Sequence, residues 1–167
     1  KGYRLLRRDG KPKRWLDKLL VNSLQSLVFN SWLAERMNRG LFDTVIHGDI
    51  AMKHETGGKF LVGDAAAEAP RAKAFEISAT GPLFGKKYHE AQFEAKQIED
   101  EVLEGFELGR PDFKALPGAR RPIRFPLTDW AVEETPDGLW VRFFLPAGAY
   151  ATAVLREVMK LTPEDVE

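Results

Sequence analysis

The sequence contains no cysteine, only three histidines, and no long apolar run among its 167 residues. Without cysteine there is no disulfide, no thiolate metal site and no cysteine nucleophile, which fits a reducing compartment, and we expect a cytoplasmic protein. No apolar run approaches the ~20 residues that span a bilayer, so no membrane association is expected. The chain begins at Lys1 and its first methionine is Met37, so we expect a piece of a longer protein.

The sequence also lacks the short motifs of several enzyme classes. The histidines, His47, His54 and His89, share no HxxxH or HExxH spacing, so no metal is expected and surface or packing roles fit them better. The glycines at 57–58 and 81–85 match neither the dinucleotide fingerprint nor the P-loop. The serine nucleophile elbow GxSxG is absent as well. No cofactor is therefore expected.

Charge is balanced in total, with 25 basic and 25 acidic side chains, but it is unevenly distributed. Residues 1–14 contain seven basic groups against Asp9 alone, whereas 90–107 contain seven acids against Lys96 alone. A basic segment attracts phosphates through counterion release. A solvated, partly disordered arm would show the same charge pattern.

Hydrophobic periodicity predicts three helices. Apolar residues recur at three- and four-residue steps over 15–39, 88–106 and 149–161. Gly40 follows the first helix as a C-cap, and Pro163 ends the third.

Strand patterns fill the intervals between these helices. Short strands are expected at 42–46, 49–54, 59–62 and 74–78, with a longer pair at 123–134 and 139–145. A Thr-Pro-Asp-Gly turn at 135–138 joins the longer pair. Aromatic residues on both sides of 139–145 predict a strand buried on both faces of a sheet. The fold class is α+β.

Three unusual loops could carry function. Lys86 and Lys87 follow a Thr-Gly-Pro-Leu-Phe-Gly segment, and Arg120 and Arg121 stand before a strand, where both pairs could meet an anion. A turn with a hydrophobic plug and ordinary surface arginines explain the same residues. The third loop surrounds Tyr150 with small residues that leave room for a planar group to stack, although Tyr150 could equally pack between helix and sheet.

Four segments in order resemble the TruD family of tRNA pseudouridine synthases. They are Gln-Ser-x-x-Phe-Asn at 25–30, Thr-Gly-Pro-x-Phe-Gly at 80–85, Gly-x-Arg-Arg-Pro at 118–122 and Leu-Pro-x-Gly-x-Tyr-Ala-Thr-x-x-Leu-Arg-Glu at 145–157. The resemblance implies isomerisation of uridine 13 to pseudouridine in the D-stem of tRNA, with tRNA as partner. It covers nearly the whole chain, but only the C-terminal half of the family's sequence.

The resemblance also implies a domain organisation, and it implies that the nucleophilic aspartate of the family is missing from this chain. It assigns 1–39 to a basic arm and junction helix, 40–121 to the family's insertion domain, and 122–167 to the C-terminal part of the catalytic domain, an antiparallel sheet with helices. The family's nucleophilic aspartate lies earlier, in a Gly-x-Lys-Asp-Arg-like motif, and no aspartate here has that context. We therefore expect this chain alone to be inactive, with no catalytic residue, and to need the missing N-terminal half.

By the same resemblance, Tyr150 presents a ring to the target uracil, and Gly148 and Ala149 keep its approach open. Extruding a base costs a few kcal/mol, and aromatic stacking returns about 1–3 kcal/mol of it. The candidates for contact with tRNA phosphates are Arg7, Arg8, Lys11, Lys13, Arg14, Lys86, Lys87, Arg120 and Arg121.

Two other functions remain open on the sequence. A non-catalytic RNA-binding module could keep the family's shape without its chemistry. Alternatively, an α+β interaction protein could use the acidic helix at 88–107 to contact a basic partner. A pseudouridine synthase and an RNA-binding module should both bind tRNA with an affinity that weakens steeply with salt. An interaction protein should have no tRNA affinity.

Overall fold

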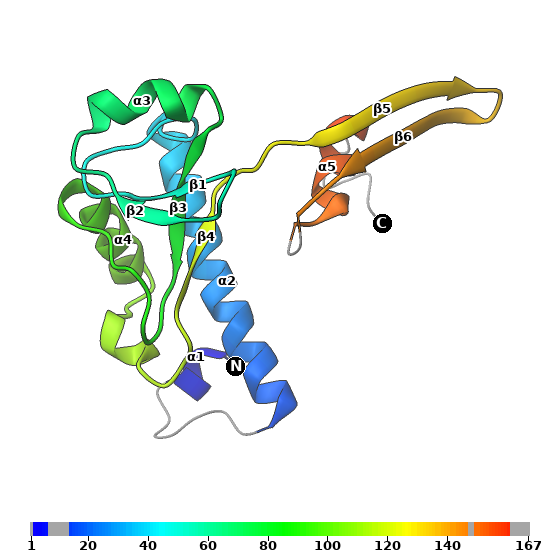
Figure 1. The fold of residues 1–167 in the computed structure, drawn as a ribbon. Helices are drawn as coiled ribbons and strands as arrows, with labels where there is room; N and C mark the ends of the chain where they lie inside the picture. The colour runs from blue at the N-terminus through cyan, green and yellow to red at the C-terminus, as the bar shows by residue number, and fades with distance from the viewer. Residues whose placement is uncertain (1, 7–13, 147–148, 161–167) are drawn as a thin grey trace. The chain divides into compact units, whose positions relative to one another are not determined.

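The computed structural model describes residues 2–6, 14–146 and 149–160, and the chain divides into two compact units, Lys1–Phe125 and Pro126–Glu167 (Figure 1). Both units combine helices with antiparallel strands, so the fold class is α+β as predicted. Within the described part of the chain, no helix has the length and apolar character needed to cross a membrane.

The first unit contains a four-stranded antiparallel sheet. Its strands are β1 (Ile50–Lys53), β2 (Lys59–Leu61), β3 (Ile77–Leu83) and β4 (Ala119–Pro122), in the spatial order β2-β1-β3-β4. The predicted strands at 49–54 and 59–62 are confirmed as β1 and β2. Gly57, at φ 70°, lies in the turn that joins them, where a residue without Cβ adopts the left-handed region at little cost.

Helices surround this sheet. They are α1 (Gly2–Leu6), α2 (Trp15–Asn38), α3 (Ala65–Lys73), α4 (Phe93–Gly105) and the 3-10 turn η1 (Arg110–Phe113). The long helix α2 packs against both β3 and α4, so it forms one side of the site described below (Figure 1).

One predicted helix begins later in the structure, and two helices of the structure, α1 and α3, were not predicted. The helix expected from residue 88 begins at Phe93, because the backbone before it has other partners: Gln92 N donates to Gly48 O at 2.9 Å. Helix α3 was not predicted, since its alanine-rich sequence has no apolar stripe. Its N-cap is Asp64, whose carboxylate accepts a hydrogen bond from Ala67 N at 3.1 Å.

The predicted strand at 42–46 is wrong. The guanidinium of Arg36 donates to the carbonyl oxygens of Leu41 and Thr44, which holds this segment in a loop. Arg36 also forms a bidentate ion pair with Asp49, at 2.8 and 3.0 Å, and both side chains are almost fully buried. A long-range ion pair therefore replaces the expected ladder of strand hydrogen bonds.

The predicted strand at 74–78 is displaced along the chain. Strand β3 starts at Ile77 and continues to Leu83, so the first four residues of the segment expected as a loop at 80–85 are strand. The arginine loop at 118–122 is likewise mostly strand β4. Pairing of β3 with β4 thus joins two of the family-like segments in one ladder.

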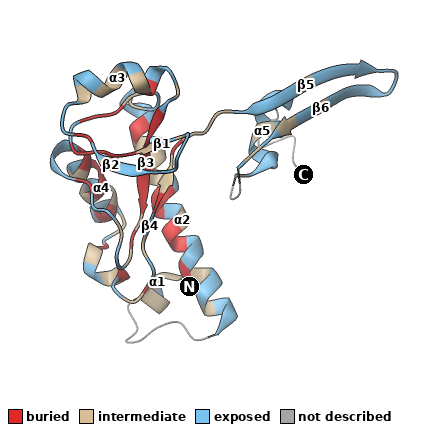
Figure 2. Ribbon diagram, viewed as in Figure 1, coloured by how far each residue is buried: buried red, intermediate tan, exposed pale blue. Residues whose placement is uncertain are grey.

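Buried side chains form two clusters in the first unit, which follow α2, β3 and α4 (Figure 2). One cluster includes Trp32, Ile77 and Ile98, and the other includes Val28, Phe84 and Phe113. Helix α1 packs on the second cluster through Tyr3, Leu5 and Leu6. Residues 2–6 are therefore packed, which corrects the reading of the whole basic head as a solvated arm.

The second unit consists of the hairpin β5 (Thr128–Thr135) and β6 (Gly138–Phe144), followed by α5 (Ala151–Met159). The predicted hairpin and its turn are confirmed, and Gly138 in the turn has φ 137°. The first strand begins at Thr128 rather than 123, because Ile123 is buried in the core of the first unit. Helix α5 is confirmed over 151–159, and Pro163 lies outside the described residues.

Burial of β6 on both faces, as the sequence predicts, is wrong for this structure. Leu139 and Trp140 are each 63% exposed. As neighbours in a strand they point to opposite faces, and Figure 2 draws most of β6 in the colour of exposed residues. A two-stranded ribbon with one helix has too few neighbours to cover either face. The aromatic pattern of this strand is therefore unaccounted for by the described part of the chain.

Candidate nucleic-acid interface

The buried side chain of Gln25 joins α2 to two loops. Its Nε2 donates to Phe84 O at 2.6 Å and to Pro117 O at 3.2 Å. A buried amide that lost these acceptors would leave polar groups unpaired, at a cost of about 1–3 kcal/mol. Gln25 therefore joins two of the four family-like segments and, through Pro117, the residue that precedes a third.

Two glycines allow the loops beneath Gln25 to touch. A Cβ built on Gly85 would lie 2.5 Å from Gly118 N, and one on Gly118 would lie 2.8 Å from the carbonyl carbon of Gly85. The backbones also pair: Lys86 N donates to Leu116 O at 2.8 Å, and Gly118 N donates to Lys86 O at 2.9 Å. The close contact explains why both segments carry glycine.

The adjacent arginines of β4 face opposite sides of the sheet. Arg121 is paired with Gly81 across the β3–β4 ladder, so both lie on the face toward α2. Because Gly81 has no side chain, the rings of Trp32 and Phe29 approach its backbone. The guanidinium of Arg121 lies 4.9 Å from the centroid of the Phe29 ring, a cation–π contact.

Arg120 lies on the other face, in the core. Its Nη1 donates to Glu99 Oε1 at 2.6 Å, its Nε donates to Thr80 Oγ1 at 3.1 Å, and its Nη2 donates to the Thr80 carbonyl. Burial raises the pKa of Glu99, while Arg120 and Arg110 oppose that rise. An enclosed guanidinium whose three nitrogens all donate to partners in the core cannot reach a phosphate, so Arg120 is removed from the predicted phosphate contacts.

A shallow groove of about 250 Å³ opens where these segments meet. We call it the Arg121 groove. Its lining residues are Asn22, Gln25, Ser26, Leu83, Pro117, Gly118, Ala119 and Arg121. The lining contains one positive charge and no acid, so the groove favours an anion.

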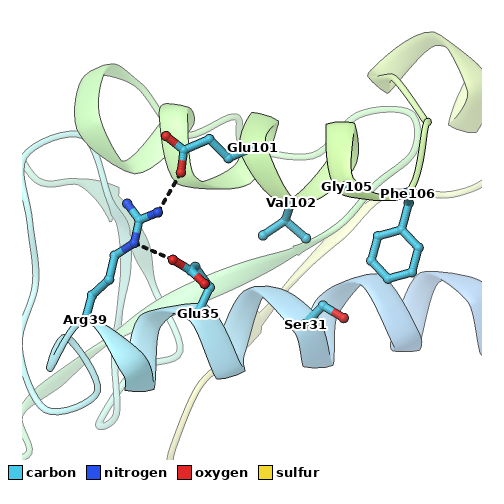
Figure 3. Close-up of a pocket in the computed structure, with 7 residues that line it drawn as sticks. All are labelled: Ser31, Glu35, Arg39, Glu101, Val102, Gly105 and Phe106. Carbon is cyan, nitrogen blue, oxygen red and sulfur yellow. Dashed lines mark hydrogen bonds and ion pairs between the residues drawn. The ribbon is translucent and has the colours of Figure 1, made fainter.

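A larger hollow, of about 370 Å³, lies between α2 and α4 (Figure 3). Arg39 donates across it to Glu101 of α4 at 2.6 Å, and to Glu35 of α2 at 2.7 Å. Two carboxylates against one guanidinium give a net charge of −1, which disfavours phosphate. We call it the acidic hollow. It lies along α4, the acidic helix that the sequence analysis considers as a contact for a basic partner.

The remaining basic candidates are distributed unevenly. Lys86 and Lys87 are exposed beside the groove-lining backbone, and Arg14 is exposed at the N-cap of α2. Four further candidates lie outside the described residues: Arg7, Arg8, Lys11 and Lys13.

Tyr150 is 71% exposed and forms the N-cap position of α5. No ring partner is found for it among the described residues. Ala149 is partly buried beside it, and Gly148 lies outside the described residues. The ring is therefore free to stack, and at 71% exposure the described residues of its unit do not enclose it.

The histidines show packing roles rather than a cluster. His47 stacks on Phe93 with a centroid distance of 4.2 Å, and His54 Nε2 lies 2.8 Å from Ser78 Oγ. No group of three potential metal ligands occurs in the part of the chain that the structure describes.

Comparison with solved structures places this fold among pseudouridine synthases. A TruD crystal structure from Methanosarcina mazei superposes with a TM-score of 0.70 and 25% identity, over 93% of this chain and 40% of that one. A family model described as tRNA pseudouridine synthase D (TruD) matches residues 12–158. The chain belongs to the TruD family.

Curated relatives agree with this assignment. A tRNA pseudouridine synthase D of Thermus thermophilus is 57% identical over 178 residues, covering 100% of this chain and 50% of the relative. That of Geotalea daltonii is 47% identical over 150 residues, covering 87% of this chain and 37% of the relative. The chain thus spans about half the length of the Thermus protein, and less of the Geotalea one.

Sequence reasoning missed the roles of Asn22, Gln25 and Ser26. A signal was present for Gln25, because it follows Leu24 and precedes Val28 on the apolar side of the predicted helix. A polar residue at such a position needs buried partners. The identity of those partners, Phe84 O and Pro117 O, could not be read from the sequence.

Proposed function

We propose that the protein to which this chain belongs is a tRNA pseudouridine synthase that isomerises uridine 13 in the D-stem of tRNA. The observation that carries the proposal is the TruD family match across 12–158. The contacts around Gln25 support it, because three motif segments distant in sequence form one packed unit. We infer the activity from relatives that are named tRNA pseudouridine synthase D.

The reaction breaks the C–N glycosidic bond of the uridine, turns the uracil within the pocket, and forms a C–C bond through C5. It requires a carboxylate as nucleophile or base, and no metal or redox cofactor. We propose that Tyr150 stacks on the uracil while Ala149 and Gly148 leave its approach open. The exposure of the Tyr150 ring supports this role.

The catalytic carboxylate is proposed to lie on the part of the protein that the longer relatives have and this chain lacks. Asp49, the most buried aspartate described, is held by Arg36 and by Ile46 N, so it has no free edge for a substrate. We therefore propose that this chain alone is inactive.

The hairpin of the second unit supports a place in a larger sheet. Val132 pairs with Val141 and Glu134 pairs with Leu139, which brings the apolar Val132, Leu139 and Val141 to one face of the ribbon, together with Glu134. We propose that residues 122–167 complete a catalytic domain whose other strands cover this face. Residues 40–121 are proposed to be the insertion domain of the family, with 1–39 as arm and junction helix.

The proposal is tested with the full-length protein and an unmodified tRNA transcript. Carbodiimide treatment followed by primer extension should show pseudouridine at position 13, and a transcript with cytidine there should show none. The present chain by itself should give no product. A full-length protein that binds tRNA without forming pseudouridine would instead favour a non-catalytic RNA-binding module. Absence of salt-dependent tRNA binding would favour an interaction protein that uses α4.

A further inference from the structure

We propose that the Arg121 groove is a phosphate subsite for the RNA strand. The inference rests on the proposed function, since it names RNA as the source of the phosphate. Asn22, Ser26 and Arg121 are the groups that would contact the phosphate oxygens.

These three side chains have unused hydrogen-bonding capacity. Within the described residues, no hydrogen bond or ion pair involves the side chains of Asn22, Ser26 or Arg121, and the contact made by Arg121 is with the Phe29 ring. An amide, a hydroxyl and a guanidinium are groups with which proteins contact nucleic-acid phosphates. Arg120, one residue away, differs because its donors are already paired inside the core.

The groove is preorganised. Pairing of Arg121 with Gly81 sets the direction of the side chain, and the Phe29 ring supports its guanidinium at 4.9 Å. Gln25 ties the floor of the groove to α2 through two carbonyl oxygens. Because little is left to order when a ligand arrives, the entropic cost of binding is reduced.

The surroundings extend the groove into a basic and polar row. Arg14, Lys18, Asn22 and Ser26 recur every four residues from the N-cap into α2, which spans about 18 Å at ~1.5 Å per residue. Lys86 and Lys87 continue the positive charge on the loop beside Pro117. A row of this length suits successive phosphates of a strand better than one small anion. The acidic hollow, with two carboxylates around Arg39, offers no such site.

The test measures binding of the tRNA transcript to the full-length protein across a salt series. Arg121→Ala should weaken binding roughly five- to tenfold and lower the slope of log K against log salt by about 0.7–0.9, the value for one lost phosphate contact. Arg39→Ala removes the same charge from the acidic hollow and should leave the slope unchanged. Arg121→Lys should keep the slope but bind more weakly, since it lacks the planar fork.

A second pair of variants avoids any loss of packing. Asn22→Asp changes one exposed atom and places a negative charge in the groove, so it should weaken binding at least as much as Arg121→Ala. Asn38→Asp makes the same change at the far end of α2 and should not. Unchanged affinity and slope in both Arg121→Ala and Asn22→Asp overturn the subsite.

The outcomes separate the subsite from the proposed function. If the wild type binds tRNA and forms pseudouridine while the groove variants behave like wild type, only the subsite is wrong. If the wild type shows no salt-dependent tRNA binding, the proposed function is wrong too. Titration with inorganic phosphate at constant ionic strength should compete weakly; competition equal to that of RNA would show a site for free phosphate and overturn the RNA assignment.

Discussion

Arg120 Nη1 lies 2.6 Å from Glu99 Oε1, and the side chains of both residues are at most 2% exposed. The next residue, Arg121, lies on the opposite face of β4 and contacts Phe29. Two arginines that are adjacent in sequence therefore have different roles: one closes the core between β4 and α4, and the other lines an open groove.

This difference predicts unequal effects on stability. Arg120→Ala leaves Glu99 with Arg110 as its one remaining cation and should lower the free energy of unfolding by about 3–5 kcal/mol. Arg121→Ala removes a partly exposed contact and should cost about 1 kcal/mol or less. Urea denaturation of both variants measures the difference. Equal losses in the free energy of unfolding would contradict a stabilising role for the buried Arg120–Glu99 ion pair.

Gly81 should not tolerate even one methyl group. A Cβ there would lie 2.3 Å from Trp32 Cζ3 and 2.6 Å from Phe29 Cε2, so Gly81→Ala overpacks the contact between α2 and β3. We expect a loss of about 1–3 kcal/mol in the free energy of unfolding. Gly105→Ala, where a Cβ meets nothing within 4 Å, serves as the matched control and should be neutral or stabilising. Similar results for the two variants would contradict the packing argument.

Tyr150→Ala should separate the proposed catalysis from tRNA binding in the full-length protein. Loss of stacking worth about 1–3 kcal/mol per base should slow single-turnover pseudouridine formation by roughly 5- to 150-fold. Affinity for tRNA should change little, because phosphate contacts supply most of it. Tyr150→Phe keeps the ring and should remain close to wild type. A normal turnover rate of the Tyr150→Ala variant would contradict the proposal that the Tyr150 ring stacks on the target uracil.

His54 should make stability depend on pH. Burial first, and the charge of Arg124 second, lower the pKa of His54 below its ordinary value of 6.5. The unfolded chain therefore takes up this proton at a higher pH than the folded chain does. The stability that His54 contributes is therefore fully present above its ordinary pKa of 6.5. It is lost as the pH falls from that value to the lower pKa of the folded state.

Thermal denaturation at pH 7.5 and 5 tests this dependence. The wild type should lose more of its Tm on acidification than His54→Gln, which keeps a hydrogen-bonding group near Ser78 Oγ. A variant that loses as much Tm as the wild type would assign the acid sensitivity to other groups.

Local patterns explain which elements could be predicted. The apolar spacing of α2 and the Thr-Pro-Asp-Gly turn before β6 involve residues close in sequence, so periodicity and turn chemistry were sufficient. The expected strand at 42–46 failed because Arg36 and Asp49, on either side of it, form an ion pair that no local pattern reports. Helix α3 was missed because its cap, Asp64, is a single side chain without an apolar stripe behind it.

The sequence alone determined the three amphipathic helices α2, α4 and α5, the β5–β6 hairpin, the α+β class and the motifs by which the family is recognised, since each depends on residue order over short distances. Only the tertiary structure decided that Arg120 is buried and that Arg121 shares a groove with Asn22 and Ser26. Neighbours in a strand point to opposite faces. Which face receives the carboxylate of Glu99 and which the ring of Phe29 depends on how α4 and α2 pack on the sheet.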